Sequence, residues 1–184
     1  NTNATTYGGA IYVAGDDALI NNSNFTRCIA YTQDGGALFV SGANVRISNS
    51  NFIENRVVGS KARGGSMYIQ GDGANIEECV FTKCTAYEGG VIYINGSDAR
   101  IEETSNTFSL AESGSAIYVA GNNVTICHFS SSFANSTSKG GSIYVEGDDA
   151  NIYNSSFSNV HSLLGGAIYL FGEMEYNVKR NILP

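Results

Sequence analysis

The 184-residue chain contains one proline, no tryptophan and two histidines, and only ten of its residues are lysine or arginine. The basic residues are scattered and the formal net charge is −7. Phosphates are bound by basic patches, so nucleic acid is excluded as an expected partner. No apolar run approaches the roughly 20 residues that span a bilayer, and we expect no membrane insertion by this segment. Apolar residues do not recur at helical spacing, which argues against amphipathic helices.

Glycine, by contrast, occurs 22 times and marks an internal repeat. A block of the type GG-A/S/V-hydrophobic-aromatic-hydrophobic begins at Gly8, Gly35, Gly64, Gly89, Gly114, Gly140 and Gly165, with Ser115 in place of the second glycine at Gly114. Successive blocks start 27, 29, 25, 25, 26 and 25 residues apart, and another glycine always follows seven residues after the first. A period of this length is typical of solenoid architectures, in which each repeat is one structural unit.

Two apolar columns accompany the block. Isoleucine recurs at Ile20, Ile47, Ile76, Ile101, Ile126 and Ile152, and phenylalanine at Phe25, Phe52, Phe81, Phe108, Phe133 and Phe157. Alternate strand residues face opposite sides, so both columns are expected to form the interior. The sequence therefore predicts an all-β fold, a right-handed parallel β-helix of about seven coils with roughly 26 residues per coil. The fourth and fifth coils reach their phenylalanine two residues late, which predicts bulges near Ser105 and Ser130.

The repeat extends across the whole chain, which we interpret as one domain over residues 1–184. Its first residues look like the tail of a preceding coil, and the pattern breaks down after Gly172. We therefore expect the chain to be a fragment of a longer surface protein. Residues 173–184 are expected to form a C-terminal cap or a junction.

The four cysteines are predicted to be free thiols. Cys28 and Cys84 share an offset but lie two coils apart, about 10 Å, which is too far for a disulfide. Cys79 and Cys127 are also two coils apart and occupy different offsets. His128 and His161 have no metal-ligand spacing to a cysteine, and we interpret them as turn or surface residues. Seven glycosylation sequons are compatible with an exported glycoprotein: Asn3, Asn21, Asn24, Asn95, Asn123, Asn135 and Asn154.

The aromatic residue of each block is predicted to form a ladder on the outer face of the coils. Its members are Tyr12, Phe39, Tyr68, Tyr93, Tyr118, Tyr144 and Tyr169. Aromatic rings offer large, rigid area and, in tyrosine, a polar tip, so the ladder is a candidate binding surface. Stacked rings also stabilise a sheet without any ligand. Both interpretations stay open.

A second candidate is the acidic cluster of Glu77, Glu78, Glu102 and Glu103, which occupy matching offsets in neighbouring coils. Carboxylates about 5 Å apart repel each other unless they are exposed or bridged by a cation. The cluster is thus a solvated acidic face or a weak Ca²⁺ site, and we expect no other cofactor. Paired carboxylates could also hydrolyse glycosidic bonds. No Arg, Lys or His occupies a nearby offset, and we assign no catalytic residue.

The unit GGSIYVEGDDANIYNSSF at residues 140–157 resembles the repeats of adhesin-like surface proteins of methanogenic archaea. The GGA blocks and the FxxN tetrapeptide from Phe52 to Asn55 also resemble chlamydial polymorphic membrane proteins. The resemblance implies a pectin-lyase-like β-helix at the cell surface, outside the cell. It implies a non-catalytic adhesin or stalk that attaches, as a monomer, to glycans or proteins of other cells. The alternative is a polysaccharide-active lyase or glycosidase of the same fold.

Overall fold

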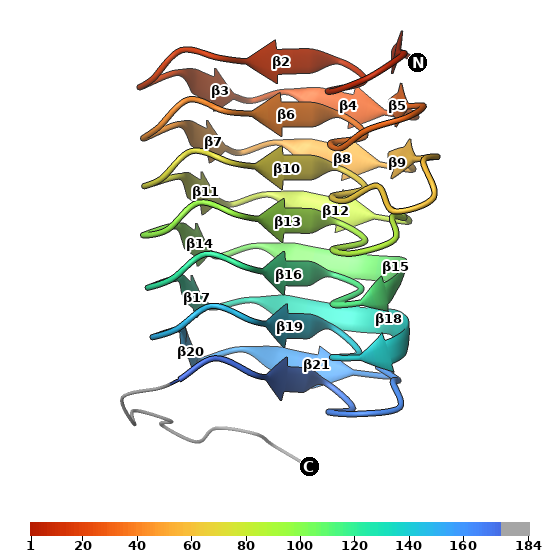
Figure 1. Ribbon diagram of the computed structural model, residues 1–184, viewed down its shortest axis with the longest axis vertical. Coiled ribbons are helices and arrows are strands. Elements are labelled where there is room, and N and C mark those ends of the chain that lie inside the picture. The colour runs from red at the N-terminus through yellow and green to blue at the C-terminus, as the bar shows by residue number, and fades with distance from the viewer. Residues whose placement is uncertain (174–184) are drawn as a thin grey trace.

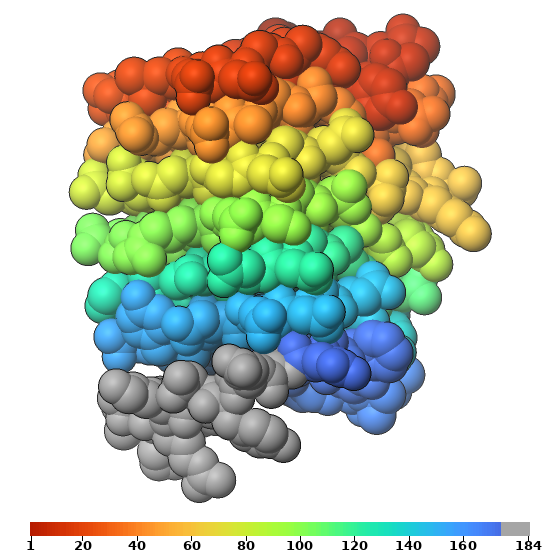
Figure 2. Space-filling model, turned by 60° about the vertical axis from the view of Figure 1, so that its left-hand side comes forward, coloured from red at the N-terminus to blue at the C-terminus, as the bar shows by residue number. Residues whose placement is uncertain are grey.

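The computed structural model describes residues 1–173, and every regular element in that range is a β-strand (Figure 1). The chain winds into coils that are stacked along one axis, so that successive coils form parallel bands of colour on the surface (Figure 2). Of the predicted cap or junction, only Glu173 is described; its amide donates to the Asp148 carboxylate of the preceding coil at 2.8 Å. The rest, residues 174–184, lies outside the described residues.

The first sheet is formed by the hydrophobic-aromatic-hydrophobic triplets of the repeat. Its seven strands are β2 (Ile11–Val13), β6 (Leu38–Val40), β10 (Met67–Ile69), β13 (Ile92–Ile94), β16 (Ile117–Val119), β19 (Ile143–Val145) and β22 (Ile168–Leu170). All pairings are parallel and join equivalent positions, as in Tyr68 with Tyr93. The predicted stacking of equal offsets is thereby confirmed.

Two further sheets complete each coil. The second sheet contains β3 (Leu19–Asn21), β7 (Arg46–Ser48), β11 (Asn75–Glu77), β14 (Arg100–Glu102), β17 (Thr125–Cys127) and β20 (Asn151–Tyr153). The third sheet contains β4 (Asn24–Thr26), β8 (Asn51–Ile53), β12 (Val80–Thr82), β15 (Ser105–Ser113), β18 (Ser130–Lys139) and β21 (Ser156–Ser158). A short sheet of β1 (Asn3–Ala4), β5 (Ile29–Ala30) and β9 (Arg56–Val57) lies at the N-terminal end. The described chain therefore makes six complete turns and the first strand of a seventh.

Each complete coil has four left-handed positions, of which one is the first glycine of the block and another follows the first sheet, as at Asp17 and Asp98. The turn between the second and third sheets places Asn22, Asn49, Glu78, Glu103, His128 and Asn154 at φ of 48–50°. A further turn follows the first three paired residues of each third-sheet strand. Its left-handed residues, at φ of 52–60°, are Arg27, Glu54, Lys83, Phe108, Phe133 and Asn159. Asparagine tolerates this conformation, whereas bulky side chains do so at a cost of about 1–2 kcal/mol.

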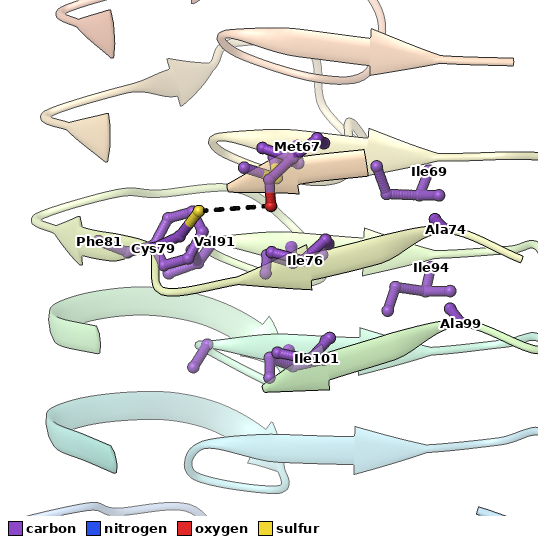
Figure 3. Close-up of a cluster of buried hydrophobic side chains, with 14 of the residues drawn as sticks. Met67, Ile69, Ala74, Ile76, Cys79, Phe81, Val91, Ile94, Ala99 and Ile101 are labelled. Carbon is purple, nitrogen blue, oxygen red and sulfur yellow. Dashed lines mark hydrogen bonds between the residues drawn. The ribbon is translucent and has the colours of Figure 1, made fainter. Parts of the chain in front are cut away.

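The interior contains the predicted isoleucine column. Ile47, Ile76, Ile101 and Ile126 are fully buried between the sheets, together with triplet residues such as Met67 and Ile94 (Figure 3). Phe25, Phe52 and Phe81 stack on one another with centroid distances of 4.8 and 5.0 Å. Each buried apolar side chain contributes about 1.5–3 kcal/mol, which offsets the ordering of many short strands.

The prediction that Phe108 and Phe133 continue this interior column is wrong. Strand pairing places Asn106 and Ser131 next to Phe81 in the column, and the two phenylalanines fall at the left-handed turn two residues later. There they point outward, 48% and 43% exposed. Phe129 is buried and fills part of the space inside the fifth coil; its ring centroid lies 6.3 Å from that of Phe157.

The predicted bulges near Ser105 and Ser130 are also wrong. Ser105 pairs in register with Val80, and Ser130 pairs in register with both Ser105 and Ser156. The coils stay in register, so Asn106 and Ser131 occupy the interior positions that phenylalanine holds in other coils. The register of β15 with β18 shifts later, between Ala111 and Ser113.

All four cysteines are buried and free, as predicted. Cys28, Cys79 and Cys84 belong to the interior core. Cys127 does not, because it alternates with the inward-facing Ile126 on β17 and therefore lies on the outer side of the second sheet.

Candidate functional site

The aromatic ladder forms as predicted, on the outer side of the first sheet and separate from the interior core. Neighbouring rings along the ladder lie 4.6–5.4 Å apart, centroid to centroid. The five members from Phe39 to Tyr144 are only 5–7% exposed, whereas Tyr12 in the first coil is 53% exposed. Because each ring face is covered by the next ring, the central rings cannot offer their faces to a ligand. The geometry favours a stabilising role, and ligand binding by the ladder stays a prediction.

Charged side chains that were not predicted from the sequence flank the aromatic ladder. The Arg63 guanidinium carbon lies 5.0 and 4.9 Å from the ring centroids of Tyr68 and Tyr93, within cation–π distance. The longer 29-residue spacing before the third block forms the loop that projects beyond β9, and Arg63 lies at its end (Figure 1). The Tyr118 hydroxyl donates to the Glu146 carboxylate at 2.8 Å. Sequence spacing alone does not show that a loop residue returns to a strand face.

Asp34, Arg63 and Glu88 line a polar hollow of about 580 Å³ beside the ladder. Arg63 donates from its guanidinium to both oxygens of Asp34, at 3.3 and 2.9 Å, and its amide donates to the same carboxylate at 2.8 Å. Burial raises the pKa of Glu88, although the nearby Arg63 charge opposes the shift. Burial also raises the pKa of Tyr93 to about 12. This hollow thus holds one ion-paired carboxylate and one carboxyl whose pKa is raised by burial.

The acidic cluster lies on the outer side of the second sheet. Glu77 pairs with Glu102 in register, while Glu78 and Glu103 occupy equivalent left-handed turns, as their matching offsets predict. The expectation that no basic side chain is nearby is wrong. Arg100 contacts Glu102 at 2.7 Å, because residues two apart on a strand share a face. This hydrogen bond lowers the pKa of Glu102. A weak Ca²⁺ site at the four carboxylates stays a prediction.

His128 is an exposed turn residue and His161 is exposed, as predicted, but the coil geometry also brings His128 close to two side chains that can bind a metal. One donor atom each from Glu102, Cys127 and His128 lies within 4.8 Å of the other two. Glu102 comes from the preceding coil, so the cluster depends on the stacking and is not visible as a sequence motif. Cys127 is fully buried in it, and Tyr153 of the next coil lies against the thiol.

A third site is a groove on the outer side of the third sheet, which sequence reasoning missed. We call it the third-sheet groove; it measures about 300 Å³ and is lined by Lys83, Thr85, Phe108, Leu110, Phe133 and Asn135. The Phe108 and Phe133 rings stack at 4.8 Å, and Leu110 beside them is 54% exposed. Lys83 and Thr85 also line a neighbouring polar hollow of about 500 Å³. The sequence signal was present in the two phenylalanines that arrive late in their coils.

Comparison with known proteins supports the fold and leaves the function open. A family model described as "Right handed beta helix region" matches residues 1–157. Neither a curated protein nor a solved structure matches the chain. Residues 1–173 contain no helix of the length and apolarity needed to cross a membrane.

Proposed function

The chain belongs to the right-handed β-helix family, and we propose that it is a non-catalytic stalk and attachment module that binds glycans through the third-sheet groove. Its fold is compatible with an adhesin and with a pectin-lyase-like enzyme, so the function is argued from the site. The main support is the outward placement of Phe108 and Phe133.

This placement costs stability at three points. Two phenylalanine side chains are withheld from the interior, where each would contribute about 1.5–3 kcal/mol. Both occupy left-handed backbone at φ of 60° and 53°, at a further cost of about 1–2 kcal/mol each. Inside, Asn106 is 2% exposed and its Oδ1 has no hydrogen-bond partner. Local departures of this kind are expected where a surface serves a function.

The chemistry of the groove suits a carbohydrate. Exposed aromatic rings pack against the apolar C–H faces of sugar rings, while the side chains of Thr85, Asn135 and Lys83 offer hydrogen bonds to hydroxyl groups. Loops around the groove are short, which suits an open surface for a chain-like or terminal glycan. A glycan of another cell is therefore the partner we propose.

We also propose that the module acts outside the cell, at the cell surface. All seven sequon asparagines are exposed, so each is accessible to glycosylation. Asn135 lies on the rim of the third-sheet groove, and modification there would cover the binding surface. Non-glycosylated chain is the appropriate material for a binding assay.

A printed glycan array with the 1–184 chain tests the proposal. The double variant Phe108→Asn/Phe133→Asn should keep the fold, because Asn159 occupies the same left-handed turn in a later coil. It should lose at least about 10-fold in glycan affinity, which is the loss expected when an aromatic anchor is removed. Val80→Asn is the matched control: Val80 is 44% exposed on the same sheet, and Asn24 and Asn51 occupy its position in earlier coils. Unchanged binding by the double variant, or no glycan bound by the folded chain, would overturn the proposal.

Tyr12→Ser separates the ladder from the groove in the same assay. Tyr12 is the most exposed ring of the ladder, and its removal leaves the central stack in place. Loss of binding in this variant, with binding retained in the double phenylalanine variant, would assign recognition to the ladder instead.

A polysaccharide-active enzyme is the second candidate, and the hollow at Asp34, Arg63 and Glu88 favours it. Glycosidases use two carboxyl groups, one of them with a raised pKa so that it can donate a proton. Burial raises the pKa of Glu88, and Asp34 is held by Arg63. Release of reducing ends from acidic and neutral polysaccharides, abolished by Glu88→Gln, would support catalysis. If no reducing ends are released, acidic and neutral polysaccharides are excluded as substrates.

A further inference from the structure

We propose that Glu102, Cys127 and His128 form a binding site for a thiophilic divalent metal ion, with Zn²⁺ as the reference ion. The site is independent of the glycan groove. Its donor atoms are a carboxylate oxygen, a thiol sulfur and an imidazole nitrogen, which are the three side-chain ligand types of protein zinc sites. Neither calcium nor magnesium selects sulfur or imidazole ligands, so the donor set points to a transition metal.

The distances suit coordination after a small adjustment. All three donor atoms lie within 4.8 Å of one another, and Glu102 Oε1 lies 3.8 Å from His128 Nδ1. Tetrahedral zinc with ordinary bond lengths holds its donors about 3.5 Å apart. The side chains of Glu102 and His128 are 27% and 49% exposed, so both can rotate by the required amount. Three protein ligands leave one position for water or a further ligand.

The surroundings orient two of the ligands. Arg100 holds Oε2 of Glu102 through Nε at 2.8 Å and Nη2 at 2.7 Å, which leaves Oε1 directed at His128. On the other side of the imidazole, Nε2 lies 3.4 Å from the side-chain amide of Asn154. The nearest atom of that amide is its nitrogen, Nδ2. A 180° flip of the amide places its oxygen there to accept from Nε2–H, and the lone pair of Nδ1 is then free for a metal. Supporting hydrogen bonds of this kind are typical of metal-bound histidine and carboxylate.

The thiol of Cys127 is a second, independent observation. The other three cysteines lie in the interior core, where each donates to backbone carbonyl groups such as those of Ile47 and Phe52. Cys127 is equally buried, yet it faces outward and lies against Glu102 and Tyr153. A fully buried thiol on an outer sheet face contributes nothing to the core. The alternation along β17 sets its direction, and ligation accounts for a thiol at a place where the preceding coil carries Glu102.

The repeat supplies substitutions that remove each ligand and retain the fold. Ser48 occupies in the second coil the position that Cys127 has in the fifth. Asn49 and Asn154 occupy the left-handed turn of His128 in other coils. Cys127→Ser and His128→Asn therefore introduce residues that other coils already accept. Cys79→Ser is the control, because Cys79 belongs to the core and Ser50 occupies the equivalent place one coil earlier.

The experiment is titration of the reduced 1–184 chain with Co²⁺ and then with Zn²⁺. Co²⁺ should produce a thiolate-to-cobalt absorption band in the near ultraviolet, and one equivalent of Zn²⁺ should abolish it. Cys127→Ser should lack the band, and His128→Asn and Glu102→Gln should weaken Zn²⁺ binding at least about 10-fold. Cys79→Ser should match the unmodified chain. A missing band in the unmodified chain, a band retained in Cys127→Ser, or equal loss in Cys79→Ser would each overturn the proposal.

Discussion

Alanine at Gly96 and alanine at Gly15 should change the stability of the chain in opposite directions. Both glycines occupy the same place in the repeat, seven residues after the block begins. Neither has the positive φ that would exclude alanine. A Cβ at Gly96 would lie closer than 3.0 Å to the carbonyl oxygen and carbon of Gly71 in the preceding coil. A Cβ at Gly15 would meet nothing within 4 Å.

The magnitudes follow from these contacts. Alanine at a conformationally compatible glycine stabilises a protein by about 0.4–1 kcal/mol, because it reduces the entropy of the unfolded chain. Gly15→Ala should show that gain. At Gly96 the same gain is opposed by the separation of two coils, an overpacking cost of about 1–3 kcal/mol. The adjacent ladder bond, from the Asn95 amide to the Ile69 carbonyl at 2.8 Å, would also lengthen. We expect net destabilisation of about 1–2 kcal/mol.

Thermal unfolding followed by circular dichroism, with urea titration as a second measurement, checks the prediction. For a chain of this size, 1 kcal/mol corresponds to a Tm change of about 2–4 °C. Gly15→Ala should melt slightly above the unmodified chain and Gly96→Ala several degrees below it. Equal stability of the two variants would refute the claim that glycine at this position sets the spacing between coils. The second glycine of the block is a poorer test, since Ser115 replaces it in the fifth coil and donates to the Gly141 carbonyl.

Three other outcomes can be measured on the same material. Asp34→Asn should cost about 2 kcal/mol in urea unfolding, because it leaves the partly buried Arg63 without its counter-charge. Glu88→Gln should stabilise the chain at about pH 7 and have no effect at about pH 4. The folded pKa of Glu88 is raised, so stability present below its ordinary pKa is lost as the pH rises through the folded value. Alkylation of Cys79 by iodoacetamide at about pH 8 should be at least ~100-fold slower than that of an ordinary thiol, since burial raises its pKa to about 11; equal labelling rates in folded and unfolded chain would contradict this.

The regular part of the molecule could be predicted from the sequence because its physics is periodic. A side chain at a given offset meets the same offset above and below, so the isoleucine column and the aromatic ladder follow from counting. How far each ladder ring is exposed could not be predicted in this way. Exposure depends on the neighbouring rings and on side chains such as Arg63, which reach the ladder from a loop.

The candidate sites were harder to predict because they arise where the period fails. The repeat pattern assigns Phe108 and Phe133 to the interior. The backbone pairing of the third sheet keeps its register, however, and places Asn106 and Ser131 there. Backbone pairing outweighs the burial of two side chains, since a shift in register would break the backbone hydrogen bonds to both neighbouring coils. The metal cluster was missed for a related reason. Glu102 and His128 are 26 residues apart and meet only after stacking.

The departures from the repeat are concentrated in the fourth and fifth coils. The exposed Phe108 and Phe133, the buried Asn106, the long strands β15 and β18 and the cluster around Cys127 all lie between residues 102 and 139. In a solenoid each coil contacts only its neighbours, so local losses of stability are borne by the regular coils on either side. Coils one to three retain an unbroken phenylalanine stack at 4.8 and 5.0 Å. This arrangement allows two coils to depart from the repeat, as the proposed binding sites require, while the neighbouring coils stabilise the rod.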